Sequence, residues 1–334
     1  MIFFILILIF FNSILFLNFA KVAKKINVYD FPDKKRKLHN KPIPSIGGLF
    51  ILNALFVSFI YMFIYTNLLF PGIKNLISFI LISLSIFALG IIDDKFSVMP
   101  NVKLCILFFM VLVFLLINEN LIIRELNFSF LDKKIYLENF SILFTILCIL
   151  LFINAFNMLD GINLIAGLYA FILFLYLYLS SNNEFFLFFL VSLLFFLIKN
   201  YQNKSFLGNN GSMLISFILS IFFIRSYKLS DILFSDQIFL IMSIPGFDML
   251  RLFLIRIFNG KNPFEADRNH LHHLLMKKFN HFNTILIFLT LFLTPMFLSY
   301  YVQTFYIPII ISFFLYSVSI IFLKLSYKKN EKIN

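Results

Sequence analysis

The chain has 334 residues, of which 61% are hydrophobic and only 13% are charged, and its mean hydropathy is +0.95. Soluble globular domains are far more polar, so this composition excludes a soluble domain and predicts an integral membrane protein. The net charge of +12 does not indicate a nucleic-acid partner, because the basic residues flank apolar runs and do not alternate with aromatic residues on a soluble surface. Anionic lipid head groups are the expected partner of these charges.

Apolar runs that could cross about 30 Å of hydrocarbon as helices recur along the whole chain. They predict an all-α integral membrane protein, a polytopic bundle of about eleven transmembrane helices near residues 2–20, 47–69, 75–92, 102–117, 141–153, 164–180, 185–199, 212–224, 237–257, 283–301 and 305–322. The first run lacks a basic start and a small-residue cleavage site, so we expect a retained anchor and no removable signal. We expect residues 1–334 to form a single membrane-embedded domain.

The basic residues predict the orientation of this bundle. The loops at 21–46, 93–103, 154–163, 199–211 and 256–282 and the tail from residue 323 together hold 21 of the 28 Lys and Arg residues, although the loop at 154–163 itself has none. Since short cytoplasmic loops carry the excess of Lys and Arg, the N-terminus is expected outside and the C-terminus in the cytoplasm. The same five loops, taken together, carry the polar motifs described next, which predicts an active site that faces the cytoplasm.

Asp93 and Asp94 end one predicted span, before Pro100. Adjacent carboxylates repel each other, and side chains about 100° apart around a helix cannot face one partner equally. The pair therefore indicates a cation site or a proton-transfer role, with a solvated helix end as the plain alternative.

The segment Asn154-Ala155-Phe156-Asn157-Met158-Leu159-Asp160-Gly161 places a polar residue at every third position, so Asn154, Asn157 and Asp160 share one face of a helix end. Amide oxygens and a carboxylate together suit a phosphate-bound cation or a sugar, and a glycine allows a sharp turn afterwards. Hydrogen bonding between helices is the alternative explanation.

A polar turn, Gly208-Asn209-Asn210-Gly211-Ser212, opens the next predicted span. Free backbone N–H groups and the helix dipole attract anions at such a position, so a diphosphate could dock there. Capping of the helix by Asn210 or Ser212 explains the same residues equally well.

Three histidines, His270, His272 and His273, fall within four residues in the loop at 256–282. A zinc site would need a further Cys, His or carboxylate at ligand spacing. Recognition of a diphosphate needs only donors, and Arg268 could add a two-pronged contact. Asp248 and Arg251, one helical turn apart, predict an ion pair at a helix end.

In this order, the motifs resemble over most of the chain the membrane polyprenyl-phosphate N-acetylhexosamine-1-phosphate transferases, glycosyltransferase family 4. The resemblance rests on Arg36-Lys37-Leu38-His39 and Pro44-Ser45-Ile46-Gly47-Gly48, Asp93-Asp94, residues 154–161, residues 208–212, Pro245 with Asp248 and Arg251, and residues 267–273. The His-x-His-His form is similar to the undecaprenyl-phosphate N-acetylglucosamine-1-phosphate transferase branch, since the pentapeptide branch usually has three consecutive histidines.

This resemblance implies a transfer that depends on Mg²⁺, with Mn²⁺ as an alternative ion. A polyprenyl phosphate would attack the β-phosphorus of a UDP-sugar, giving a polyprenyl-diphospho-sugar and UMP, at the inner membrane of a bacterium. By position, the resemblance implies Asp93, Asp94, Asp160 and His272 as catalytic residues and Asp94, Asp160 and Asn209 as metal ligands. It implies Lys41, Asn154, Asn157, Gly161, Asn163, Phe206, Arg268, His270 and His273 as substrate-binding residues.

Two positions depart from the family pattern. Asn209 stands where the family has an aspartate that binds magnesium, and Asn163 replaces a second carboxylate near the nucleotide. A relative with weakened activity is therefore one alternative, and a transporter or flippase of lipid-linked or anionic cargo is another. The identity of the UDP-sugar, the prenyl chain length and the formation of a homodimer are left open by the sequence.

Overall fold

The computed structural model describes residues 1–32, 41–65, 72–262, 269–302 and 304–331. These residues are mostly helical and form two compact units. The first unit comprises Met1–Arg124 and Leu137–Asp231, and the second comprises Glu125–Tyr136 and Ile232–Asn334. The expectation of a single domain stays a prediction, and each unit is described by itself.

In the first unit the helices are α1 (Ile2–Ile26), α2 (Gly48–Ile64), α3 (Ile73–Phe96), α4 (Pro100–Ile117), α5 (Ser141–Leu159), α6 (Ile165–Ser181), α7 (Phe186–Tyr201) and α8 (Gly208–Lys228). Short 3-10 turns occupy η1 (Glu119–Leu121) and η2 (Glu138–Phe140), and β1 (Tyr29–Asp30) pairs antiparallel with β2 (Ile43–Pro44). In the second unit, β3 (Glu125–Leu126) pairs antiparallel with β4 (Ile135–Tyr136). It also holds α9 (Ser235–Ile241), α10 (Ser243–Phe258), α11 (Leu271–Lys278), α12 (His281–Leu298) and α13 (Tyr306–Glu331).

Among the described residues, seven helices are long and apolar enough to cross a membrane: α1, α3, α4, the segment Glu138–Leu159, α8, α12 and the segment Tyr306–Ser326. The pair α9 and α10 reaches the same criterion jointly, although the two helices are bent by 75° at their junction. Three shorter apolar helices, α2, α6 and α7, complete the set. The protein is therefore an all-α multi-pass membrane protein, as the composition predicts.

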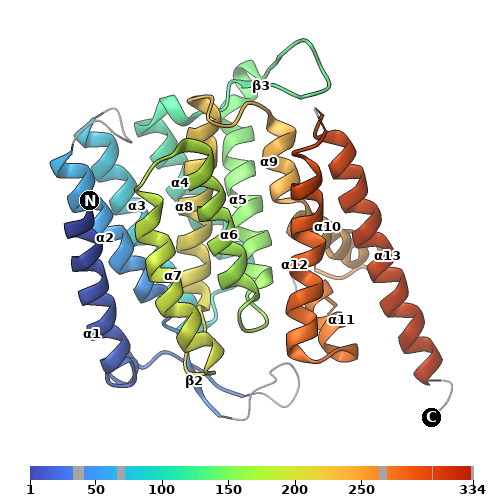
Figure 1. Cartoon of the computed structure of the whole chain (residues 1–334), viewed down its shortest axis with the longest axis horizontal. Helices are drawn as coiled ribbons and strands as arrows, with labels where there is room; N and C mark the ends of the chain where they lie inside the picture. The colour runs from blue at the N-terminus through green and yellow to red at the C-terminus, as the bar shows by residue number, and fades with distance from the viewer. Residues whose placement is uncertain (33–40, 66–71, 263–268, 303, 332–334) are drawn as a thin grey trace. The chain divides into compact units, whose positions relative to one another are not determined.

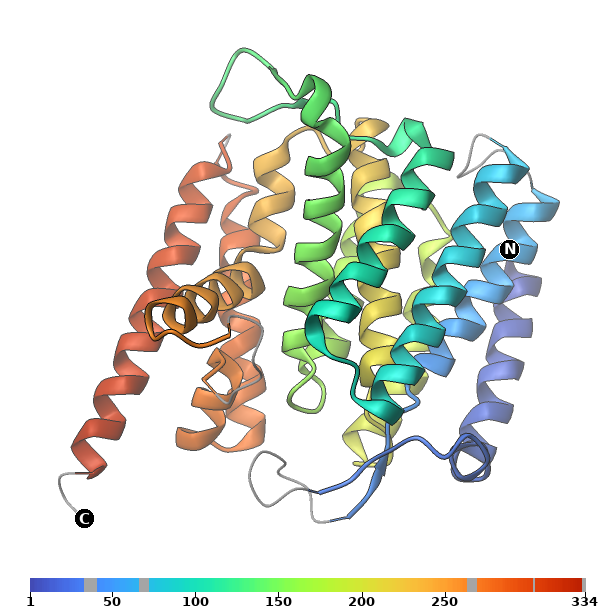
Figure 2. The ribbon, with the colours of Figure 1, turned by 180° about the vertical axis from the view of Figure 1, so that it is seen from behind.

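Helix α8 forms the centre of the first unit, and its sequence explains why. It has the lowest hydropathy of the seven spans and is 89% buried over its most apolar window. Its serines and glycines would gain nothing from contact with lipid, whereas small and polar residues favour close packing between helices in a membrane. In Figures 1 and 2, α8 runs through the middle of this unit, packed against α2, α3, α5 and α6.

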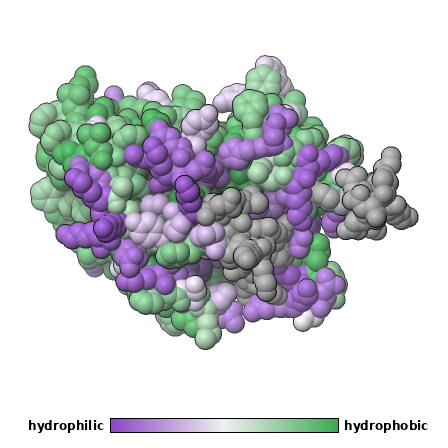
Figure 3. Space-filling model, turned by 90° about the horizontal axis from the view of Figure 1, so that it is seen from below, coloured by the Kyte–Doolittle hydropathy of each residue, from purple (hydrophilic) through white to green (hydrophobic). Residues whose placement is uncertain are grey.

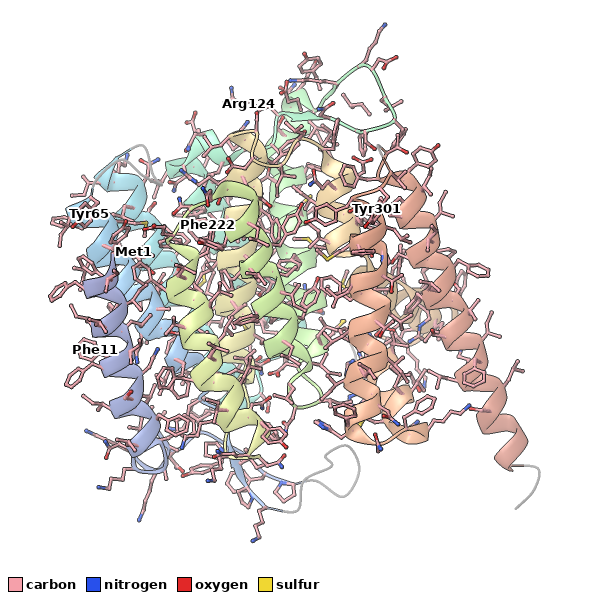
Figure 4. All side chains as sticks on the ribbon, in the orientation of Figure 1. Met1, Phe11, Tyr65, Arg124, Phe222 and Tyr301 are labelled. Carbon is pink, nitrogen blue, oxygen red and sulfur yellow. The ribbon has the colours of Figure 1, made fainter. Side chains whose placement is uncertain are left out.

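Aromatic side chains fill the interior around α8. Phe222 is fully buried and packs against Phe185 and Phe186 of the α7 region, with ring centroids 4.9 and 5.2 Å apart. Phe11 on α1, by contrast, is half exposed and points outward (Figure 4). Phenylalanine therefore serves both as core filling and as a surface suited to lipid.

Close packing brings α3 and the start of α8 together. A Cβ on Gly90 would lie 2.5 Å from the backbone nitrogen of Asn210 and 2.8 Å from the carbonyl carbon of Asn209. Only glycine permits this approach, because backbone atoms cannot move aside as a flexible side chain can. Gly208, the first residue of α8, has a φ of +73°, a backbone conformation that is strained for any residue with a side chain. These two glycines set the position of the first polar residues of α8 beside the end of α3.

In the second unit, α10 packs against α12 and α13, and α11 packs against the same two helices. Ser243 and Ser312 share a buried hydrogen bond of 2.8 Å between α10 and α13. The β3–β4 hairpin is held by Asp236 at the start of α9, whose carboxylate accepts hydrogen bonds from the backbone and hydroxyl of Ser129. Polar contacts therefore hold α10 to α13 and the β3–β4 hairpin to α9.

Candidate active site

Asp94 supplies the negative group that the start of α8 requires. Its Oδ1 accepts a hydrogen bond from the backbone of Asn209 (2.9 Å), and its Oδ2 accepts from the backbone and the side chain of Asn210 (3.1 and 2.7 Å). The first N–H groups of a helix lack partners within it, and the helix dipole favours an anion there. The anion at this helix start is thus a carboxylate from α3, and no side chain of α8 itself caps the helix.

Asp93 points to a different partner. Its Oδ1 accepts from the backbone of Val98 (2.9 Å), and its Oδ2 pairs with the ammonium of Lys103 on α4 (2.8 Å). Both oxygens of this buried carboxylate thus hold the turn between α3 and α4. The two adjacent aspartates serve separate partners, as the rotation of about 100° between neighbours on a helix predicts.

The segment that follows β2 lies against the start of α8. The backbone of Phe206 donates to the carbonyl of Pro44 and accepts from the backbone of Gly47, both at 2.9 Å. The side-chain Nδ2 of Asn210 also donates to the carbonyl of Ser45 at 2.6 Å. These contacts bring the half-buried Phe206 to the same end of the unit as the exposed Lys41. Hydrophilic side chains gather on this end of the first unit (Figure 3).

Asp160 follows the last residue of α5 and lies close to the α3–α8 junction. Burial raises the pKa of Asp160 well above its usual value, and the negative charge of Asp94 raises it further, while the backbone N–H of Gly208 opposes the shift. Three segments distant in sequence therefore meet here: the end of α3, the end of α5 and the start of α8. Among the described residues, no lysine or arginine forms an ion pair with Asp94 or Asp160.

The donor atoms at this junction fit a magnesium ion. Two neighbouring carboxylates without a cationic partner leave negative charge uncompensated, which is costly where water is scarce. Magnesium prefers oxygen ligands and is commonly held by one or two carboxylates together with phosphate oxygens and water. Within the described part of the chain, no three His, Cys, Asp or Glu side chains are placed as ligands of one metal ion. Asp94 and Asp160 supply the carboxylates that such an ion would need, and the assignment of Asp94, Asp160 and Asn209 as its ligands stays a prediction.

The two asparagines of α5 differ in what they contact. Asn157 accepts a hydrogen bond of 2.6 Å from the hydroxyl of Ser212, which ties α5 to α8. Asn154 donates to the carbonyl of Leu150 in its own helix, at 2.9 Å. Interhelical hydrogen bonding, the alternative to substrate binding, thus describes Asn157 in this structure, and the substrate-binding role of both residues stays a prediction.

Asn163 belongs to a network of amide side chains between two loops. It donates to the side chain of Asn203 and accepts from Asn200, which in turn binds the carbonyl of Ser205 and the backbone N–H of Leu164. A carboxylate at position 163 could accept from Asn200 but could not donate to Asn203. Asn163 therefore adds two side-chain contacts to the network that ties the α5–α6 loop to the α7–α8 loop. Gly161, in the same loop, is exposed.

The histidine motif lies in the second unit, at the start of α11. His270 precedes the helix, and its Nδ1 lies 2.9 Å from Oδ2 of the buried Asp248. The rings of His270 and His272 are nearly parallel, with centroids 5.6 Å apart, and the rings of His272 and His273 are 4.4 Å apart. The three histidines therefore form one cluster of side chains in contact.

His272 is the least accessible histidine of this cluster. It is fully buried, and within the described part of the chain neither of its ring nitrogens has a hydrogen-bond partner. Burial lowers the pKa of His272 well below its usual value, with smaller contributions in the same direction from His273 and His270. His272 is thus a neutral ring at pH 7, and no described residue satisfies either of its nitrogens.

Sequence reasoning missed several of these partners. It predicted the ion pair of Asp248 and Arg251, which the structure confirms at 2.9 Å. It did not find that Asp248 binds His270, that Tyr316 joins the same carboxylate, or that Lys103 pairs with Asp93. The spacing of Asp248 and Arg251 was the one signal available, because the other partners lie on different helices.

Arg268 and residues 36–39 lie outside the described residues. Three of the four polar motifs meet within the first unit, and the fourth, the histidine motif, belongs to the second. The convergence of all four motifs on one site stays a prediction.

These features define a class: a multi-pass helical membrane protein in which carboxylates and amides from three helix ends meet. The family model described as glycosyl transferase family 4 matches residues 76–227. The chain is 31% identical over 266 residues to a probable undecaprenyl-phosphate N-acetylglucosaminyl 1-phosphate transferase of Bacillus subtilis (strain 168), covering 77% of this chain and 72% of the relative. It is 29% and 28% identical to the undecaprenyl-phosphate alpha-N-acetylglucosaminyl 1-phosphate transferases of Yersinia pestis and Escherichia coli (strain K12), covering 81% of this chain and 76% of each relative. The chain belongs to glycosyl transferase family 4.

Proposed function

We propose that this protein transfers an N-acetylhexosamine-1-phosphate from a UDP-sugar to undecaprenyl phosphate, releasing UMP and starting a lipid-linked glycan of the cell envelope. The names of the relatives support this activity. The observation that carries it in the structure is the junction of Asp94, Asp160 and the start of α8, where two carboxylates meet without a cation among the described residues.

In the proposed reaction, an oxygen of the lipid phosphate forms a bond to the β-phosphorus of the UDP-sugar, and the bond from that phosphorus to the oxygen of UMP breaks. Phosphoryl transfer of this kind depends mainly on positioning and on neutralising the charge of the transferred group. A bound magnesium ion would supply that neutralisation. Asp94 and Asp160 would hold the ion, Asn209 would add an amide oxygen, and the histidine cluster would contact the diphosphate, with His272 as its catalytic member.

The remaining substrate-binding residues are proposed to act around this centre. Phe206 would stack on the base, with Lys41 nearby, because the β2 segment and the loop before α8 are tied together by backbone hydrogen bonds. Asn154, Asn157 and Asn163 would line the sugar side of the site. Arg268 would add a two-pronged contact to phosphate.

Asp93 is proposed as a residue that prepares the lipid phosphate, but its pairing with Lys103 supports a second role in shaping the α3–α4 turn. Two variants distinguish the role in the turn from a direct role at the lipid phosphate. If Asp93 only holds the turn, Lys103→Gln should reduce activity as much as Asp93→Asn does. A much larger loss for Asp93→Asn would support direct action on the substrate.

We also propose eleven membrane crossings, with the N-terminus outside and the active site facing the cytoplasm at the bacterial inner membrane. The seven long spans, the bent pair α9–α10 and the three shorter apolar helices number eleven together. An odd number of crossings places the two termini on opposite sides, as the distribution of Lys and Arg requires.

The direct test is an assay of membranes that contain the protein, with undecaprenyl phosphate and a panel of UDP-sugars, in which UMP release is measured with and without Mg²⁺ or Mn²⁺. We expect one UDP-N-acetylhexosamine to give UMP and lipid-linked product only when the metal ion is present. Asp94→Asn and Asp160→Asn should abolish both signals while the protein still inserts. If no UDP-sugar gives UMP, the proposed activity is refuted, and the alternative of a family member with weakened activity is favoured.

One observation favours a second candidate, a transporter of lipid-linked or anionic cargo. Transporters often bind cargo at broken helices, and α9–α10 is a broken span or a re-entrant segment with the buried, charged Asp248 within two turns of the break. The carboxylates Asp94 and Asp160, however, lie at helix ends, where an enzyme of the membrane surface needs them. Movement of labelled cargo across sealed vesicles without UMP release would favour the transporter.

A further inference from the structure

The buried Asp248 on α10 collects hydrogen bonds from four donor groups. Oδ1 accepts from Arg251 (2.9 Å), from the hydroxyl of Tyr316 (2.8 Å) and from the backbone N–H of Leu271 (3.2 Å). Oδ2 accepts from the same N–H (3.2 Å) and lies 2.9 Å from Nδ1 of His270. With so many donors directed at its two oxygens, Asp248 is a carboxylate and can only accept hydrogen bonds.

The consequence for His270 is a fixed position of one hydrogen. Because Asp248 can only accept, Nδ1 of His270 must carry the hydrogen that lies between the two groups. In the neutral ring, Nε2 is then the nitrogen with the lone pair, directed away from Asp248. A carboxylate behind a histidine sets the tautomer and the orientation of the ring in the same way in metal sites and in catalytic triads.

The same carboxylate also starts the helix that carries the other two histidines. The contact of Asp248 with the backbone of Leu271 satisfies the first N–H group of α11 and places negative charge at its N-terminus. Since the rings of His270, His272 and His273 contact one another, the orientation of the first ring constrains the next. The carboxylate of Asp248 therefore contacts the motif at a side chain, that of His270, and at the backbone of Leu271.

Asp248 is itself held from two sides. The guanidinium of Arg251 binds Asp248, the hydroxyl of Tyr316 (2.6 Å) and the carbonyl of Asn269 (2.5 Å), immediately before His270. Tyr316 belongs to α13, so the last helix of the chain takes part in fixing the motif. A carboxylate restrained in this way loses little further freedom when substrate binds, which is the requirement for a preorganised site.

We propose that Asp248, restrained by Arg251 and Tyr316, is a positioning residue that fixes the tautomer of His270 and the orientation of the three histidine rings. This inference rests on the proposed function for its effect on turnover. The hydrogen position itself follows from the contacts of the second unit alone.

The test uses Asp248→Asn in the full-length protein, because the amide has nearly the same shape as the carboxylate. The amide oxygen of the new asparagine keeps the place of Oδ1 and accepts from Arg251 and Tyr316. The amide NH₂ group then faces Nδ1 of His270 and donates to it, so the ring hydrogen moves to Nε2. ¹⁵N spectra of the imidazole nitrogens read this change directly. The chain has only five histidines, and the signals of His270 are assigned by their absence in His270→Gln.

We expect the wild type to carry a hydrogen on Nδ1 of His270 and Asp248→Asn to carry none there. The kcat of Asp248→Asn, per folded molecule, should be roughly 10- to 100-fold lower than that of the wild type. Tyr316→Phe keeps the carboxylate and should retain the hydrogen on Nδ1 with a smaller loss of kcat. The matched control is Asp236→Asn, which alters another buried aspartate of the same unit that binds Ser129 and contacts no histidine of the motif. It should leave the ¹⁵N signals of His270 unchanged.

Two results would overturn the positioning role: a wild-type His270 without hydrogen on Nδ1, or an Asp248→Asn variant with the kcat of the wild type. If the wild type itself releases no UMP from any UDP-sugar, the proposed function fails. The ¹⁵N spectra still decide whether Asp248 fixes the ring, so the two failures are distinguishable.

Discussion

Asp94, Asp160 and Asn209 show how single residues combine at the proposed metal site. Asp94 offers two oxygens that already accept three hydrogen bonds from the start of α8. Asp160 lies close enough for the charge of Asp94 to raise its pKa, after the larger effect of burial. Asn209 provides an amide oxygen where the resemblance to the family implies an aspartate, so fewer negative charges would attract the ion. The affinity for Mg²⁺ should therefore depend on residue 209.

Asn209→Asp is predicted to lower the Mg²⁺ concentration needed for half-maximal UMP release. If the added negative charge strengthens Mg²⁺ binding by about 1.4 kcal/mol, the Mg²⁺ concentration required falls roughly ten-fold. The control is Asn203→Asp, which makes the same substitution at an exposed position and keeps the oxygen that accepts from Asn163. An unchanged requirement in Asn209→Asp would place the ion elsewhere.

His272 gives a prediction about stability and pH. Its folded-state pKa lies below the value of about 6.5 of an unfolded histidine, so unfolding takes up a proton at acidic pH. The stability contributed by the neutral ring is present above pH 6.5 and is lost as the pH falls through 6.5 toward the folded pKa, by about 1.4 kcal/mol per pH unit.

This loss is measured as the pH dependence of thermal unfolding of the purified protein between pH 7.5 and 5.5. His272→Gln should show a weaker dependence than the wild type, because the group that takes up the proton is absent. His281→Gln, at the start of α12 and outside the motif, should keep the wild-type dependence. An equal slope for His272→Gln and the wild type would contradict the burial of a neutral His272.

At the scale of the elements, the site depends on how closely helices pack and on where they end. The polar residues of α3 and α5 reach α8 because both helices end at the end of the unit where α8 begins, and because Gly90 allows α3 to approach the backbone of Asn210. The hydrogen bond from Ser212 to Asn157 then ties α5 to the same helix. The geometry of the site is thus a property of helix spacing as much as of the polar side chains.

Gly90→Ala is predicted to destabilise the protein by about 1–3 kcal/mol, since the added methyl group would overlap backbone atoms of α8 and force the helices apart. Gly246→Ala is the matched control within a helix, because a Cβ there meets no atom within 4 Å. Alanine favours a helix by about 1 kcal/mol over glycine, so this control should be neutral or stabilising. Thermal unfolding in detergent compares the two, and equal stability would contradict the close approach of α3 to α8.

How much of the site the sequence predicts can be judged residue by residue. The divergence of Asp93 and Asp94 follows from helix geometry and is observed. The sequence left open whether Asn210, Ser212 or a bound anion satisfies the start of α8, and the structure gives that role to Asp94. The contact is 115 residues apart in sequence, so no local pattern could reveal it. The link from Asp248 to His270 was missed for the same reason, although both residues were recognised as members of motifs.

On the scale of the whole molecule, charge and hydropathy carry the prediction of orientation. The α3–α4 turn at Ser97 is expected in the cytoplasm, and η1 after α4 is expected outside, because the excess of Lys and Arg lies in the loops on the side of the former. Both positions belong to the first unit and flank the same helix. One span therefore tests the proposed topology.

Ser97→Cys and Glu119→Cys are to be made in a background in which Cys105 and Cys148 are replaced by serine. Both introduced positions are exposed, so a membrane-impermeant maleimide can reach them where water is present. In intact spheroplasts we expect labelling of the cysteine at 119 only, and in inverted vesicles labelling of the cysteine at 97 only. The reverse pattern would place Asp94 and Asp160 outside and remove the cytoplasmic nucleotide site.

By itself, the sequence determined that this is a helical membrane protein, where its apolar segments run, and which polar motifs interrupt them. Those properties are set by composition and by patterns within a few turns of one helix, and hydrophobic burial and backbone hydrogen bonding in lipid leave little alternative. Only the tertiary structure decided which partner each motif serves: Lys103 for Asp93, the start of α8 for Asp94, Ser212 for Asn157 and Asp248 for His270. A side chain on a helix can face any of several neighbours, and the packing of the helices selects among them.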